Sequence, residues 1–255
     1  MYHSVSTEGS GSASSADPLT VPRAVIDEQW SALVSAGWRL LGLTEALQAH
    51  AADPAAKVLG VTFDDGRDDF VLVPDLLVRH DAKATLYVPT AHIGGPGGPV
   101  YHAGRVLSWE ELAELPQDRV EIGSHSHRHL PTDVLPDREL AAEVATSRKE
   151  LQDRLGRPVW SFCYPHGYAG ARQGRIVAAA GFRNACVVGR RLSGWADDLF
   201  LLPRLQVLPE HGGRQILALV ERGERGWGPR AKEIAHPPWR TVRRGVYRRS
   251  GRVLT

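Results

Sequence analysis

The chain has 255 residues, of which 42% are hydrophobic, a composition that supports a folded core and excludes an intrinsically disordered chain. The formal net charge of +2 excludes a chain-wide attraction to polyanions. The charge is unevenly distributed. Residues 222–255 carry ten lysines and arginines and two glutamates, so their net charge is +8, and the net charge of the remaining residues is −6.

The first third of the chain predicts alternating strands and helices. A very short first strand precedes a flexible Ser/Gly-rich loop at residues 5–18. The elements expected next are a helix at 27–36, a strand at 38–43, a helix at 44–51, a strand at 57–63, a helix at 68–80 and a strand at 84–89. The β-branched stretch 57–63 stops at Asp64, as a buried parallel strand does.

The same alternation continues along the rest of the chain. Ser108 and Glu111 form the pattern of a capping box at the start of a helix at 108–115, and Gly156 ends a long helix at 137–155. The other expected elements are strands at 120–123, 159–164, 183–188 and 199–207, and a helix ending at Gly181. Repeated strand–helix units predict a parallel α/β sheet, either a barrel or a doubly wound sheet. We place one domain at residues 1–221 and a basic tail at 222–255.

Three polar clusters each follow the end of a predicted strand, at residues 64–65, 125–129 and 165–167. Because the carboxyl ends of parallel strands meet at one rim, these clusters are expected to converge. Each cluster alone also fits an ordinary surface turn or a His-rich loop.

The residue types of the clusters favour a catalytic metal. His125 and His129 share one side if the segment turns helically, and neutral imidazole is a common zinc ligand. Two histidines and one aspartate leave coordination positions open, and a second aspartate can act as general base toward a metal-bound water. The same ligand types suit non-haem iron oxygenases, but the adjacent second carboxylate favours hydrolysis.

The order TFDDG, H-S-x-x-H and F-x-Y-P-x-G resembles the NodB-type polysaccharide deacetylases, carbohydrate esterase family 4. MYHSVS, WRLLGLTEAL, KATLYVPTAHIG, LSWEEL and VEIGSHSHRHLPT extend the likeness, which covers about residues 1–207. The resemblance implies a distorted (β/α)7 barrel and a divalent metal, with zinc expected, held by Asp65, His125 and His129. It also implies that Asp64 is the catalytic base and that the backbone N–H of His166 donates a hydrogen bond to the oxyanion of the tetrahedral intermediate.

The sequence departs from the family pattern in two places. Many members carry an arginine before the Pro-x-Gly turn, where this chain has Phe162 and Cys163. We expect Arg204 to contact Asp64 and orient it instead. Many members also end with a Leu-x-His whose histidine is the general acid, whereas LLPRLQV at 201–207 has none. The candidates for the acid are His211, His3 and His166, or the metal-bound water network.

The resemblance implies removal of an N-acetyl group from an N-acetylglucosamine-type glycan, either lipid-linked or a small glycoconjugate. Two alternatives stay open. One is a catalytically weakened carbohydrate-binding domain that kept the fold, and the other is a different C–N amide hydrolase on the same scaffold.

The two ends of the chain give predictions about the cellular location of the protein and about its contact with membranes. The first residues lack a basic segment followed by an apolar core, and no stretch approaches the ~20 apolar residues that span a bilayer, so we predict a cytoplasmic protein. In the tail, residues 239–252 alternate aromatic and apolar residues with arginine pairs, which predicts peripheral contact with anionic membranes. No nucleic-acid partner is expected, because no recognition motif is present.

Overall fold

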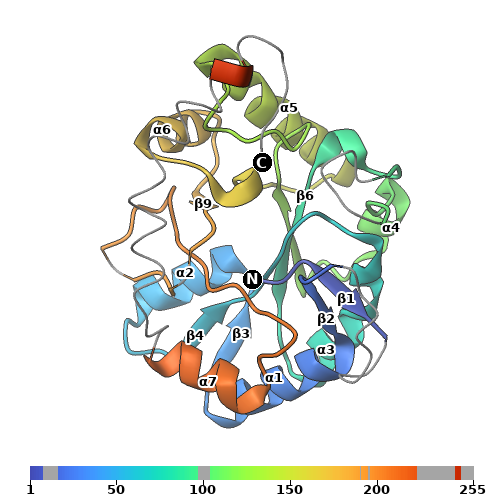
Figure 1. The fold of residues 1–255 in the computed structure, drawn as a ribbon, viewed down its shortest axis with the longest axis vertical. Helices are drawn as coiled ribbons and strands as arrows, with labels where there is room; N and C mark the ends of the chain where they lie inside the picture. Colours follow the sequence, from blue (N-terminus) through green and yellow to red (C-terminus); the bar gives the residue numbers. More distant parts are fainter. Residues whose placement is uncertain (8–16, 97–103, 190, 195, 223–244, 248–255) are drawn as a thin grey trace.

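The computed structural model describes residues 1–7, 17–96, 104–189, 191–194, 196–222 and 245–247. Its strands pair in parallel and are surrounded by helices (Figure 1). The main sheet has the order β5 (Thr62–Phe63), β6 (Ala84–Val88), β7 (Val120–Ser124), β8 (Ser161–Cys163) and β9 (Asn184–Cys186). Two smaller sheets pair β1 (Ser4–Ser6) with β2 (Thr20–Pro22), and β3 (Arg39–Leu41) with β4 (Val58–Gly60).

The first residues of the chain close the curled sheet. Tyr2 forms a parallel bridge with Phe63, and the backbone N–H of Val207 donates to Met1 O at 3.0 Å. The chain start therefore lies between β5 and the stretch near Val207. This arrangement is the expected distorted (β/α) barrel, and it brings residues from opposite ends of the chain together at one rim.

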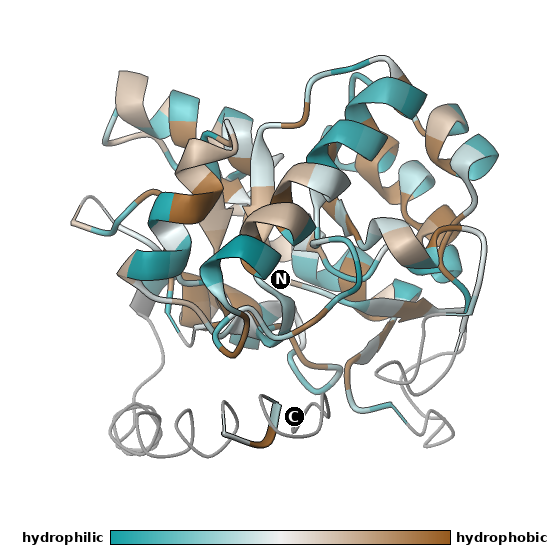
Figure 2. Cartoon of the chain, turned by 90° about the horizontal axis from the view of Figure 1, so that it is seen from above, coloured by the Kyte–Doolittle hydropathy of each residue, from teal (hydrophilic) through white to brown (hydrophobic). Residues whose placement is uncertain are grey.

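The helices lie on the outside of the strands, and hydrophobic and hydrophilic residues alternate along them (Figure 2). They are α1 (Arg23–Ser35), α2 (Leu43–Ala52), α3 (Pro74–Arg79), α4 (Trp109–Glu114), α5 (Asp137–Leu155), α6 (Ala171–Ala179) and α7 (Gly213–Arg222). Three short 3-10 helices are η1 (Asp68–Leu72), η2 (Thr90–His92) and η3 (Pro165–Gly167). None of the helices in these described residues is long and apolar enough to cross a membrane.

Two of the helix signals in the sequence are confirmed. Helix α5 has the predicted bounds, and Gly156 ends it in the left-handed conformation, at φ 64°. The capping box at α4 is present, since Glu111 N donates to Ser108 Oγ at 3.2 Å and Ser108 N donates to Glu111 Oε2 at 2.7 Å.

Two predicted elements are divided, one predicted strand is not formed, and one helix was not predicted. The strand at 57–63 is split into β4 and β5, because its first part pairs with β3 and its second part with β6. Pro74 separates η1 from α3 within the helix expected at 68–80.

The prediction of a strand at 199–207 was wrong. This stretch makes only single bridges, and Pro203 lacks the N–H that a continuous ladder needs. Helix α7 packs on α1, where Gly213 N donates to Glu28 Oε1 at 2.8 Å.

Much of the predicted loop and tail lies outside the described residues. The loop at 5–18 overlaps β1 at its start, and its residues 8–16 are not described. Within the tail at 222–255, the described residues are 222 and 245–247. Tyr247 donates to Glu139 Oε1 of α5 at 2.8 Å.

Candidate metal centre and active site

The three polar clusters converge at the carboxyl ends of neighbouring strands. Asp64 and Asp65 directly follow β5, His125 directly follows β7, and η3 begins two residues after the end of β8. The parallel order of these strands places all three clusters at the same rim, as the sequence predicted.

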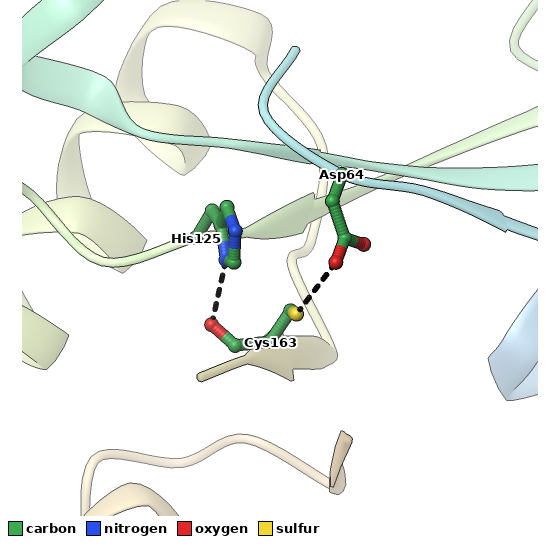
Figure 3. A group of neighbouring side chains, drawn as sticks. All are labelled: Asp64, His125 and Cys163. Atoms are coloured by element: carbon green, nitrogen blue, oxygen red, sulfur yellow. Dashed lines mark hydrogen bonds between the residues drawn. The ribbon is translucent and has the colours of Figure 1, made fainter. Parts of the chain in front are cut away.

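Asp65, His125 and His129 direct their ligand atoms toward one another. Asp65 Oδ1 lies 3.4 Å from His125 Nε2 and 3.5 Å from His129 Nε2, and all three side chains are buried. The His125 Nδ1–H donates to the backbone oxygen of Cys163 at 2.9 Å (Figure 3), so Nε2 is the ring nitrogen that faces Asp65. One carboxylate and two imidazoles at this spacing fit a catalytic divalent ion such as zinc.

Backbone strain is concentrated at this rim. Four of the five described non-glycine residues with positive φ lie here: Asp65 (75°), Ser126 (64°), His129 (57°) and His166 (59°). The segment 125–129 is therefore not the helical turn that the sequence suggested. Left-handed conformations at Ser126 and His129, with His129 N donating to Ser126 Oγ at 3.1 Å, bring the two imidazole rings to 4.7 Å between centroids. Such strain is typical of sites that fix side-chain direction.

The electrostatics of Asp65 and His129 suit metal binding. At His125, burial lowers the pKa, but the hydrogen bond with Asp65 and the charge of Asp64 outweigh burial and raise it. Burial lowers the pKa of His129 to about 4 despite the opposing effect of Asp65, so its imidazole is neutral at physiological pH. Burial alone raises the pKa of Asp65, but hydrogen bonds from His125 and His129 outweigh it and hold that pKa well below its ordinary value. The site thus offers an ionised carboxylate and a neutral imidazole, the states in which both bind metals.

The second carboxylate, Asp64, pairs with Arg204. Arg204 Nη1 donates to Asp64 Oδ1 at 2.7 Å and Nη2 donates to Oδ2 at 2.8 Å, so the contact expected between them is present. Both side chains are buried. Burial alone raises the pKa of Asp64, but the charge and hydrogen bonds of Arg204 outweigh it and hold that pKa far below its ordinary value.

Asp64, His125 and Cys163 form a second group whose potential ligand atoms lie close together. This group suits a cation less well, because Arg204 already occupies both oxygens of Asp64 and its guanidinium would repel a metal ion there. The trio with Asp65 is therefore the better metal site.

The three histidines that are candidates for the general acid lie at different distances from Asp64 and the trio. His3 Nε2 lies 3.9 Å from Asp64 Oδ2. The ring of His166 lies 5.0 Å from that of His129, with its centroid 6.4 Å from the Tyr168 ring. His211 lies in the turn before α7, where its Nδ1 accepts from Leu208 N at 3.1 Å and its backbone oxygen accepts from Gln29 Nε2. Within the described part of the chain, it makes no hydrogen bond or ion pair with the trio or with Asp64.

One residue of the site was not singled out from the sequence. The Cys163 side chain is buried beside both Asp64 and Arg204, at 3.5 Å from Asp64 Oδ2 and 3.0 Å from Arg204 Nη2. The only available signal was that Phe162 and Cys163 occupy the segment where many family members carry an arginine.

A cavity of about 420 Å³ lies behind the site and is lined mainly by apolar side chains, including Trp30 and Trp38. Thr62 and Arg204 border it, but none of the three candidate metal ligands does. The cavity therefore does not mark the reacting centre.

Comparisons with known proteins agree with the fold and with the motifs. The polysaccharide deacetylase family model matches residues 51–185. The protein YxkH of Bacillus subtilis strain 168, whose name places it among the polysaccharide deacetylases, is 25% identical over 224 residues, covering 87% of this chain and 75% of YxkH.

Solved structures share the fold at lower sequence identity. The Streptococcus pyogenes deacetylase PplD in complex with acetate gives a TM-score of 0.73 at 22% identity, covering 85% of this chain and 94% of PplD. The de-N-acetylase from Aggregatibacter actinomycetemcomitans gives a TM-score of 0.73 at 18% identity, and the match covers 86% of this chain and 97% of the de-N-acetylase. The family match spans more than half of the sequence. The chain therefore belongs to the polysaccharide deacetylase family, enzymes that remove acetyl groups from acetylated sugars.

Proposed function

We propose that this chain hydrolyses the N-acetyl group of an N-acetylglucosamine-type glycan, either lipid-linked or a small glycoconjugate, with a divalent metal held by Asp65, His125 and His129. Zinc suits this ligand set. The observation that carries the proposal is the division between the two adjacent carboxylates. Asp65 faces two histidines, whereas Asp64 is held by Arg204.

The residues of the site have complementary tasks in amide hydrolysis. A divalent ion bound at the trio supplies Lewis-acid polarisation and a lowered water pKa. Asp64, kept ionised by Arg204, accepts the proton of the attacking water as a C–O bond forms at the acetyl carbon. The backbone N–H of His166 donates to the oxygen that becomes negative, and cleavage of the C–N bond yields acetate and a free amine.

The leaving nitrogen needs a proton donor, and His3 is the best placed of the candidates. It lies beside Asp64, from which it is separated by 3.9 Å. His166 borders the metal trio instead and serves better through its backbone. His211 contacts Leu208 and Gln29, neither of which belongs to the site, so these contacts give no support to a role for it as the acid.

The alternatives predict different behaviour. A carbohydrate-binding domain that had lost catalysis would not need a buried carboxylate held ionised beside a metal trio. Another C–N hydrolase would release no acetate but would open a cyclic amide or cleave a different acyl group. Acetate release is therefore the discriminating measurement.

We also propose that the basic tail contacts anionic membrane surfaces. The support is the charge of +8 on residues 222–255, most of which lie outside the described residues. The cytoplasmic location stays a prediction.

The direct test uses the full-length chain with N-acetylglucosamine oligomers and measures acetate release after chelation and after zinc addition. We expect chelation to abolish the release and zinc to restore it. His125→Ala should also lose metal by elemental analysis. The matched control is His127→Ala, since His127 Nδ1 instead contacts Thr90 Oγ1 at 2.8 Å and Glu150 Oε2 at 3.3 Å. Full metal content in His125→Ala would contradict the assignment of the ligands.

A further inference from the structure

We propose that Cys163 is a positioning residue for the reaction, whose thiol fixes the Asp64 carboxylate against the Arg204 guanidinium. The inference rests on the proposed function, in which Asp64 is the base. It concerns a side chain in the segment 162–163, where many family members have an arginine, and no motif gives it a role.

Three atoms of these residues form a closed triangle. Arg204 Nη2 lies 2.8 Å from Asp64 Oδ2 and 3.0 Å from Cys163 Sγ, and the sulfur lies 3.5 Å from the same Oδ2. The thiol accepts from the guanidinium and donates to the carboxylate, both of which are within the capacity of a cysteine side chain. The thiol thus links the two members of the ion pair.

The setting makes this link hard to replace by solvent. Cys163, Asp64 and Arg204 are all buried. Burial raises the pKa of the Cys163 thiol well above its ordinary value, so it keeps the proton that it donates. Without the sulfur, Oδ2 would lose a donor, and the guanidinium would gain room to shift.

Cys163 contacts the candidate metal site through a different atom. Its backbone oxygen accepts from His125 Nδ1, whereas its side chain points to Asp64 (Figure 3). A substitution at residue 163 changes the side-chain contact and keeps the backbone contact. The effects on the base and on the metal can therefore be separated.

The chain contains a matched control for this side chain. Cys186 is the register partner of Cys163 on the neighbouring strand β9, and it is equally buried. Its Sγ contacts the backbone oxygen of Phe162 at 3.7 Å, and no hydrogen bond joins it to Asp64 or Arg204 among the described contacts. Cys186 also interacts with the Cys163 thiol. Cys186→Ala removes a buried thiol from the same layer and keeps the three atoms of the triangle, Arg204 Nη2, Asp64 Oδ2 and Cys163 Sγ.

The kinetic test compares Cys163→Ala, Cys163→Ser and Cys186→Ala on the N-acetylglucosamine oligomers. A weak hydrogen bond to a charged group predicts a fall in kcat of about 3- to 10-fold for Cys163→Ala, with KM and metal content unchanged. Cys163→Ser should recover part of the loss, because a hydroxyl also donates and accepts. Cys186→Ala should retain normal kcat. Equal losses in both alanine variants, or a loss that serine does not recover, would overturn the proposal.

A second measurement does not depend on catalysis. The chain has two cysteines, so Cys186→Ala leaves the Cys163 thiol as the single source of an S–H stretching band. We expect this infrared band to shift when Asp64→Asn is added, because the acceptor changes from a carboxylate to an amide. An unchanged band would overturn the contact. If the band shifts but Asp64→Asn retains turnover, the contact stands and the assignment of Asp64 as base fails.

Discussion

Arg204 and Asp64 lie 140 residues apart in the sequence and form a buried bidentate ion pair. The pair satisfies both carboxylate oxygens of Asp64 at a point where an adjacent carboxylate, Asp65, would otherwise favour its protonation. The arginine reaches the base from the stretch after β9 instead of from the segment before the Pro-x-Gly turn. The charge is thus supplied from a different element of the barrel.

Arg204→Gln should move the acidic limb of the kcat/KM profile to higher pH by about 1–3 units. The ionised base is present only above its pKa in the folded protein, and Arg204 lowers that pKa, so removing the charge raises it. Metal content should not change. Arg204→Lys, which keeps a charge but not the two-pronged contact, should give a smaller shift. A profile of Arg204→Gln that overlays the native one would refute the role.

Asp64→Asn and Asp65→Asn should separate catalysis from metal binding. Asp64→Asn removes the base, and we expect about a 10²–10⁴-fold lower kcat with the metal retained. Asp65→Asn weakens metal binding itself, because Asp65 is the trio's only carboxylate. Kinetics and elemental analysis of both variants check the assignment. Near-normal turnover in Asp64→Asn would show that the roles are wrong or reversed.

His3→Gln should lower kcat by about 10²-fold or more if His3 protonates the leaving amine. The comparison variant is His211→Gln, which should retain activity, since the hydrogen-bond partners of His211 are Leu208 and Gln29, neither of which belongs to the site. A substrate with a better leaving group than a sugar amine should reduce the defect of His3→Gln. Equal activity of the two variants on the natural type of substrate would remove His3 from the mechanism.

Glu111→Gln should change the stability of the fold at acidic pH. Hydrogen bonds from Arg105 and from the Ser108 backbone lower the pKa of Glu111 from 4.5 to about 2. A lowered pKa contributes stability above about pH 4.5, and this contribution disappears as the pH falls toward 2. Denaturant unfolding should show the native chain losing more stability than Glu111→Gln over this window. Parallel curves for the two proteins would contradict this.

Truncation near Gly226 should lower binding to anionic vesicles at low salt, since each basic residue near such a surface contributes about 1 kcal/mol. Release of acetate from a small soluble substrate should stay almost unchanged. Neutral vesicles serve as the control, and a sedimentation assay measures the bound fraction. Equal binding of the two forms to anionic vesicles would leave the tail without a membrane role.

Local patterns in the sequence determined most of the element order and the three polar clusters that meet at the rim. The strand–helix alternation, the capping box at Ser108 and the stop at Gly156 depend on residues close in the chain, which is why they could be predicted. The same holds for the polar residues at strand ends, because parallel strands bring such ends to one rim.

Only the tertiary structure decided which atoms meet across the barrel. The left-handed backbone at Asp65 turns one carboxylate toward the histidines while its neighbour Asp64 faces Arg204, so two adjacent aspartates have different surroundings. Barrel closure brings His3 and Cys163 to Asp64, whereas His211 contacts Leu208 and Gln29 instead. Sequence periodicity specifies the face on which a side chain lies. The distance between side chains on distant strands depends on how those strands close together, which no local pattern encodes.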